Sequence, residues 1–92
     1  MNSLWTKNGT PLQVATTAVY SKSGRYVGEI HGDKVYDTSG QYAGTIVGDR
    51  VVYRGSDSGN AYGSVGRADM AGIGIANRAS AGIWGEEPTR LL

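Results

Sequence analysis

His31 is the only histidine of this 92-residue chain, and it lies two residues before Asp33 in the stretch His31-Gly32-Asp33. An imidazole beside a carboxylate can exchange protons in acid–base catalysis, because histidine titrates near neutral pH. The sequence has no cysteine, and no serine in a nucleophile-elbow motif accompanies this pair to complete a catalytic set. We interpret His31 as an ordinary residue at a strand end and predict that the protein is not an enzyme.

Four aspartates in or beside predicted turns could offer oxygen ligands to a calcium ion. They are Asp33, Asp37, Asp49 and Asp57. An EF-hand loop holds its ligands within about 12 residues, whereas these carboxylates belong to separate turns. Aspartate is also common in turns because its carboxylate accepts hydrogen bonds from nearby backbone amides. We interpret the four as turn residues and predict no bound metal and no cofactor.

Basic residues recur beside aromatic residues along the chain, which is typical of a surface that binds single-stranded nucleic acid. They are Lys22, Arg25, Lys34, Arg50, Arg54 and Arg67. Nine basic residues are balanced by eight acidic ones, however, and the net charge is only +1. Interspersed charges of both signs give no electrostatic footprint for nucleic acid. We therefore predict ion pairs between neighbouring strands and no nucleic-acid partner.

Six tyrosines and two tryptophans could form a face that binds a sugar or a short peptide, because their rings offer stacking area. The hydrophilic loop at residues 55–60 is a second candidate, since loops on a rigid scaffold often carry binding residues. The ligand-binding candidates are Tyr53, Asp57, Asn60 and Tyr62. Because the chain has no phenylalanine, the tyrosines must also build the core. We expect most of them to pack in the core or at an interface.

The elements that position these residues come from an internal repeat. Residues 19–34 and 35–50 are nearly the same sequence with a period of 16 residues, and degenerate copies occupy 4–12 and 52–65. A repeat this short cannot bury its own apolar face, so the units must share a core. Each unit reads as two short strands. We predict an all-β domain of four successive two-stranded hairpin units in a pseudo-four-fold arrangement.

Glycines at fixed places in the repeat have two predicted roles. Those that end the first turn of a unit are Gly24, Gly40 and Gly59, and those within a strand are Gly28, Gly44 and Gly63. The turn glycines fit the left-handed position of a three-residue hairpin loop, and glycine first in Gly32-Asp33 and Gly48-Asp49 is typical of a type II′ turn. A glycine within a strand weakens it unless another group comes close. We therefore predict close contacts at the strand glycines, and an early end or a wider spacing where Gln13 replaces them.

After residue 67 small residues dominate the sequence, so we divide the chain into a repeat domain, 1–67, and a C-terminal segment, 68–92, that packs on it. Each glycine disfavours an exposed helix by about 1 kcal/mol relative to alanine. We predict extended pieces at 72–76 and 81–84, with a helix tucked among the units as the alternative. Residues 86–92 are predicted to be an exposed tail whose last leucines could dock.

Residues 5–65 resemble the four-fold beta-flower proteins, small bacterial domains of four successive two-stranded units. The resemblance is carried by the cadence aromatic-x3-Gly-x3-Gly-x-Ile-x-Gly, which is almost intact at 20–32 and 36–48. The fourth unit departs from the pattern because Tyr62 directly precedes Gly63, and residues 68–85 have no counterpart. The resemblance implies a fold and no catalytic residues.

A domain of this size has a thin core, and without cysteines self-association is the expected supplement. No apolar run has the length of a signal peptide or a membrane span, so we expect a soluble protein, cytoplasmic by default. The leading hypothesis is a non-enzymatic structural or protein-interaction module that forms a homo-oligomer or binds another protein. The alternative is a small β module that binds a ligand or carbohydrate through its Tyr and Trp residues and the loop at 55–60.

Overall fold

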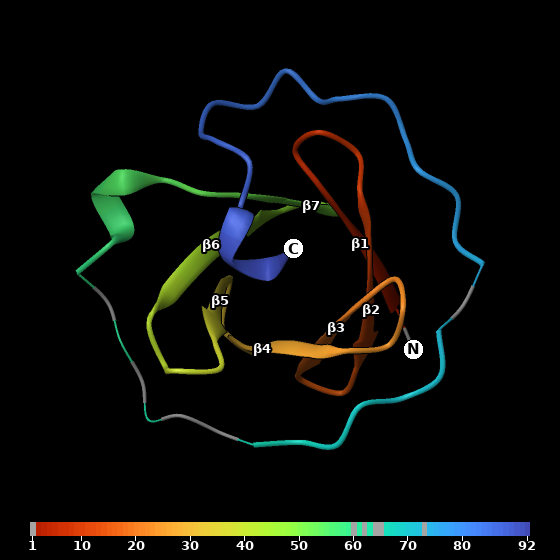
Figure 1. Cartoon of the computed structure of the whole chain (residues 1–92). Helices are drawn as coiled ribbons and strands as arrows, with labels where there is room; N and C mark the ends of the chain where they lie inside the picture. The colour runs from red at the N-terminus through yellow and green to blue at the C-terminus, as the bar shows by residue number, and fades with distance from the viewer. Residues whose placement is uncertain (1, 60, 62, 64–65, 73) are drawn as a thin grey trace.

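The fold is a closed β-barrel, seen in a computed structural model that describes residues 2–59, 61, 63, 66–72 and 74–92 (Figure 1). Its strands are β1 (Asn2–Thr6), β2 (Pro11–Ala15), β3 (Ala18–Ser21), β4 (Tyr26–His31), β5 (Lys34–Asp37), β6 (Tyr42–Val47) and β7 (Arg50–Val52). Two short 3₁₀ turns follow, η1 (Gly55–Asp57) and η2 (Thr89–Leu91). Neighbouring strands are antiparallel, except that β7 pairs in parallel with β1 to close the barrel.

The prediction of an all-β chain is confirmed, whereas the four-fold arrangement of hairpin units is not. Three hairpins follow one another as β1-β2, β3-β4 and β5-β6, and β7 begins a fourth unit. The chain then leaves the barrel at η1, and β1 takes the place beside β7, with Trp5 opposite Arg50. Tyr62 of the predicted fourth unit lies outside the described residues.

The turns follow the residue types closely. Gly24 and Gly40 have φ of 96° and 87°, and Gly32 and Gly48 have φ of 65° and 63°, as the predicted turns require. Gly59 has no positive φ, so its expected left-handed role is wrong: the chain there follows the 3₁₀ turn η1 instead of a hairpin loop.

Each hairpin after the first contains a bulge that turns two consecutive small residues toward the interior. In β4, Gly28 pairs with Val19 and Tyr26 pairs with Tyr20, so the intervening Val27 has no opposite residue. Val27 and Gly28 therefore both face inward, because Val19 belongs to the interior cluster. That cluster contains Leu4, Leu12, Val14, Val19, Val27, Val35, Ala43, Val51 and Leu91.

The last residues of the chain plug one end of the barrel. We call residues 86–92 the plug. Its residues Pro88 and Leu91 are buried, and Figure 1 shows its 3₁₀ turn over the middle of the barrel. The predicted docking of the last leucines is confirmed for Leu91, whereas the exposed tail is wrong for Pro88 and Leu91 and holds for Leu92, which is 46% exposed. The reason is the space that glycine leaves inside the strands, which apolar side chains of the plug fill.

The strand glycines show this space directly. A Cβ added to Gly28 would lie 2.5 Å from the carbonyl oxygen of Tyr36 and 3.2 Å from Cδ2 of Leu91. A Cβ on Gly44 would lie 2.6 Å from Cγ1 of Val51 and 3.5 Å from Cβ of Pro88. These two glycines thus make the close approaches that the sequence predicts.

Two other positions differ from the sequence-based prediction. At Gly63 an added Cβ would meet nothing within 4 Å, because this exposed residue lies beyond the barrel strands and not within one. Gln13 neither ends β2 nor widens its spacing: the strand continues to Ala15 and pairs with β1 and β3. The Gln13 side chain fits because it lies buried beside backbone carbonyls, to which its amide donates.

Residues 58–85, which we call the belt, circle the outside of the barrel without forming a helix or strand among their described members (Figure 1). The Met70 amide donates to the Gly24 carbonyl at 2.7 Å, and the Arg78 amide donates to the Gly9 carbonyl at 2.9 Å. The belt thus docks on the turns that end the hairpins. The expected extended pieces at 72–76 and 81–84 lie in it, with Ile73 outside the described residues.

Candidate functional site

Four tyrosines of the strands are buried, and two of them pack against the belt. Tyr20, Tyr26, Tyr36 and Tyr42 are all less than 9% exposed. Tyr20 and Tyr26 pack edge to face with ring centroids 5.7 Å apart, in a cluster that Met70 of the belt adjoins. These four rings have the burial expected of core residues, so the described tyrosines of the strands offer no open aromatic face.

His31 and Asp33 lie at the opposite end of the barrel from the plug and have separate described contacts. The His31 ring is 5.6 Å from the ring of Tyr36 at an interplanar angle of 64°. Asp33 accepts a hydrogen bond from the Lys34 ammonium at 3.2 Å, and its side chain is 68% exposed. This geometry is that of an edge-packed ring and a surface ion pair.

The aspartates considered as calcium ligands are held apart by the fold. Asp49 pairs with Arg78 of the belt, and Asp57 accepts a hydrogen bond from the Thr45 hydroxyl at 2.9 Å. In the described part of the chain, no three His, Cys, Asp or Glu side chains are placed to hold a metal ion together.

Asp37 caps the β5-β6 turn and holds the plug. Its Oδ1 accepts hydrogen bonds from the Ser39 amide at 2.9 Å and the Gln41 amide at 3.1 Å, while Oδ2 accepts one from Arg90 at 2.9 Å. Partial burial acts to raise the pKa of this carboxyl, but the hydrogen bonds from Ser39, Gln41 and Arg90 outweigh burial, and the pKa lies below its usual value. The charged form is therefore the one that the folded protein stabilises.

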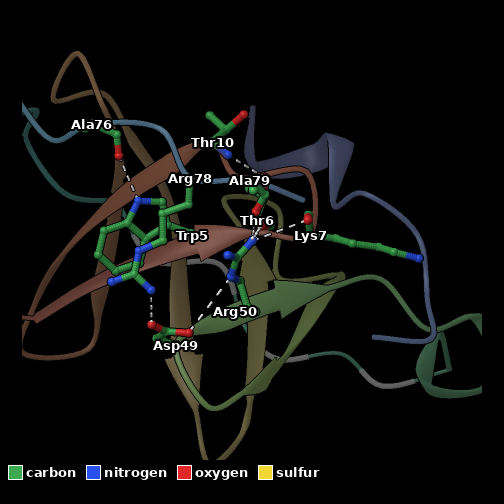
Figure 2. A network of polar contacts seen from close by, with 9 residues as sticks. All are labelled: Trp5, Thr6, Lys7, Thr10, Asp49, Arg50, Ala76, Arg78 and Ala79. Atoms are coloured by element: carbon green, nitrogen blue, oxygen red, sulfur yellow. Dashed lines mark hydrogen bonds and ion pairs between the residues drawn. The ribbon is translucent and has the colours of Figure 1, made fainter. Parts of the chain in front are cut away.

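A second polar network clamps the belt to β1 and β7 (Figure 2). The Arg78 guanidinium lies 3.6 Å from the ring centroid of Trp5 and pairs with Asp49, and the Trp5 indole donates to the Ala76 carbonyl at 2.9 Å. Arg50 donates to the Ala79 carbonyl at 2.8 Å. Cation–π contacts of this kind contribute roughly 0.5–1 kcal/mol at exposed sites, so the network holds the belt in place.

Glu29 and Arg67 form the corresponding link on the other side of the barrel. The Arg67 Nε lies 2.6 Å from Oε1 of Glu29, whose side chain is almost fully buried. The hydrogen bond from Arg67 and then the charge of Glu29 raise the pKa of the Arg67 guanidinium. Burial, followed by the charge of Glu29, raises the pKa of the neighbouring Tyr26 hydroxyl. The pair joins the belt to β4.

A pocket of about 360 Å³ lies where β7 meets the plug. Its described lining residues are Tyr53, Glu86, Glu87, Thr89 and Arg90. Of the predicted ligand-binding residues, Tyr53 lines this pocket, whereas Asp57 is engaged by Thr45. Asn60 and Tyr62 lie outside the described residues.

Trp84 is the most exposed large apolar side chain of the described chain, at 62%. Its ring lies 3.9 Å from the guanidinium carbon of Arg54, which also donates to the Trp84 carbonyl at 3.4 Å. The backbone of Glu86, two residues later, exchanges two hydrogen bonds of 2.7 Å with Tyr53. Trp84 and Arg54 therefore lie along the chain next to pocket residues.

The sequence patterns singled out Arg50 and Arg67 but not Arg78, Glu87 or Arg90, which also hold the belt and plug. A signal for the belt is nevertheless present. Met70, Arg78 and Glu86 are each eight residues apart, and each makes a backbone hydrogen bond to the barrel. Gly66, Gly74 and Gly82, four positions before them, share this spacing. A period of half the strand repeat thus marks the docking points of the belt.

Comparison with protein families, with curated proteins and with solved structures found no match to this chain. Among the residues that the structure describes, no helix has the length and apolarity needed to cross a membrane.

Proposed function

We propose that this chain is a non-enzymatic structural or protein-interaction module that associates with further copies of itself. The observation that supports it is the use of charged side chains to hold the belt and plug on the barrel. The pairs are Glu29 with Arg67, Asp49 with Arg78, Asp37 with Arg90, and Glu87 with Thr6. Active sites gather titratable groups in one cleft, whereas these pairs are distributed around the barrel.

Self-association is favoured by the construction of the plugged end. The plug inserts into a barrel that is built from other residues, and the covalent chain that connects the two parts runs through the belt. Sedimentation velocity over a wide concentration range tests this part of the proposal. We expect the dimer fraction to rise with concentration, and a monomer at every concentration would contradict it. An activity abolished by His31→Ala would contradict the non-enzymatic part.

A second candidate function, binding of a carbohydrate, is favoured by the pocket beside Tyr53. An aromatic ring with carboxylate, hydroxyl and guanidinium groups around it suits a polyhydroxylated ligand, which needs a stacking surface and both donors and acceptors. The Glu86 carboxylate has no described partner within the chain and is exposed at this pocket. It is therefore the group that we expect to bind sugar hydroxyls.

Titration with a panel of mono- and oligosaccharides, followed by backbone NMR, tests this candidate. We expect shift changes at Tyr53, Glu86 and Thr89, and at least tenfold weaker binding in Glu86→Gln, since hydrogen bonds to charged groups contribute about 1.5–3 kcal/mol. Asp33→Asn, at the opposite end, is the control and should bind as the wild type does. Absence of any shift at millimolar saccharide would remove the candidate.

A further inference from the structure

We infer that the plugged end of the barrel is a binding site for the segment 86–92 that also accepts this segment from a second copy of the chain. The inference rests on the proposed self-association and names the surface that performs it.

The apolar part of the site is preformed by the barrel. Gly28 and Gly44 leave space on the inner face of β4 and β6, and Leu91 and Pro88 occupy it. Leu91 is fully buried and belongs to the same cluster as Val35 of β5. Proline and leucine thus act as the apolar anchors of the segment.

Polar contacts fix the direction and register of the segment. Glu87 accepts hydrogen bonds from the Thr6 hydroxyl at 2.7 Å and the Asn8 amide at 2.9 Å. Arg90 donates to Asp37 at 2.9 Å. The Leu92 carbonyl accepts from Arg25 at 3.0 Å. These contacts alternate with the apolar anchors. The site therefore selects a segment with an acidic residue, a proline, an arginine and a leucine in that order.

The groups that make these contacts with the plug belong to the barrel, and none of them belongs to the belt. The apolar and polar partners lie on β1, β4, β5 and β6 and on their turns. An identical segment of another copy would therefore find an identical site. Exchange of an identical element between copies is a low-cost route to a dimer, because the contacts of the closed monomer are kept.

The belt is long enough to make this exchange. The 33 steps from Tyr53 to Glu86 could span roughly 100 Å when extended, at about 3.3 Å per residue. The whole molecule measures 33 × 31 × 18 Å. The belt itself is held by the contacts of Met70 and Arg78 described above, and in an exchanged dimer each belt can form them again. Exchange between two copies is bimolecular, so the exchanged fraction should grow as the protein becomes concentrated.

The test uses the full chain carrying Leu91→Ala and a fluorescent peptide of residues 86–92. In this variant the chain's own plug is weakened, and we expect the peptide to bind at least about 30-fold more tightly than it binds the wild type. A peptide with Leu91→Ala is the matched control and should not bind either protein. Equal binding of the two peptides to the folded variant would overturn the inference.

If Leu91→Ala does not fold, the full chain with Arg90→Ala replaces it, because this change removes a polar anchor and leaves the core intact. We then expect a gain of several-fold in peptide binding over the wild type, and no gain would overturn the inference. Excess peptide, but not the control peptide, should also dissociate wild-type dimers. If wild-type dimers persist in excess peptide, the plugged end is not the dimer interface, although the proposed self-association would stand. If the peptide binds but the chain never dimerises, only the proposed self-association is refuted.

Discussion

At the scale of single residues, the strained position is Thr16 in the β2-β3 turn. Its φ is 58°, and among the described residues it is the only one other than glycine with a positive φ. Gly32 and Gly48 occupy the corresponding place in the β4-β5 and β6-β7 turns, with φ of 65° and 63°. A β-branched side chain in the left-handed region is a true outlier. The first unit therefore has a less favourable turn than the units that follow.

We expect Thr16→Gly to stabilise the protein by about 0.5–1 kcal/mol. Relief of the left-handed conformation gains about 1–2 kcal/mol, and the greater freedom of glycine in the unfolded chain offsets part of it. Urea denaturation measures the difference. Thr17→Gly is the control and should destabilise, because Thr17 has no positive φ and its hydroxyl donates to Glu29. A loss of stability in Thr16→Gly would contradict the prediction.

The lowered pKa of Asp37 predicts how the stability of the protein depends on pH. Because its folded pKa lies below the usual value, the carboxylate adds stability at pH above about 4, and this contribution is lost as the pH falls through the folded pKa. We expect Asp37→Asn to be about 1.5–3 kcal/mol less stable at pH 7 and to lose less on acidification than the wild type. Urea titrations at pH 7 and pH 3 measure this, with exposed Asp33→Asn as the control that keeps the wild-type pH dependence.

At the scale of elements, glycine turns serve both the hairpins and the belt. Gly24 has φ of 96° and accepts a hydrogen bond from the Met70 amide. A Cβ on Gly24 would lie 1.7 Å from the Met70 carbonyl oxygen. The next residue of the belt toward the N-terminus, Asp69, accepts a hydrogen bond from the Tyr26 amide at 2.8 Å. Turn and belt thus satisfy each other's backbone groups.

Gly24→Ala should therefore displace the belt. We expect a loss of about 2–4 kcal/mol, which adds the steric clash and lost contacts to a left-handed penalty of about 1–2 kcal/mol. The Tyr26 amide should also exchange its hydrogen faster. Gly32→Ala is the matched control, since Gly32 has a positive φ but an added Cβ would meet nothing within 4 Å. It should show the left-handed penalty alone, and equal losses in the two variants would argue against belt docking at this turn.

At the scale of the whole molecule, the barrel is closed twice. The parallel pairing of β1 with β7 closes the wall, and the plug closes one end. A chain of this length has a small core, and Leu91 extends that core from the far end of the sequence. The plug thereby enlarges the small core of the barrel.

We expect Leu91→Ala to destabilise the protein by about 2–5 kcal/mol, the range for emptying a buried leucine site. Leu92→Ala, at a side chain that is 46% exposed, should change stability by less than about 0.5 kcal/mol. Thermal and urea unfolding of the pair measure both. A similar small effect at the two positions would mean that the plug contributes little to the closed monomer.

Much of the local structure could be predicted from the sequence. The strand pairs of the hairpins and the positive φ of Gly24, Gly32, Gly40 and Gly48 follow from residue types that act within a few positions. The close approach at Gly28 and Gly44 was also foreseen, since glycine within a strand implies a near neighbour. For the candidate site, only Tyr53 was identified in advance among the described pocket residues.

The sequence by itself determined the strands, their turns and the glycine positions, because these depend on backbone preferences that each residue carries locally. Only the tertiary structure decided that β7 closes on β1, that the belt packs on Tyr20 and Tyr26, and that Leu91 fills the space above Gly28. These contacts join residues far apart in the chain. Their stability comes from apolar burial and charge pairing between complete surfaces, and such surfaces exist only after the hairpins have formed.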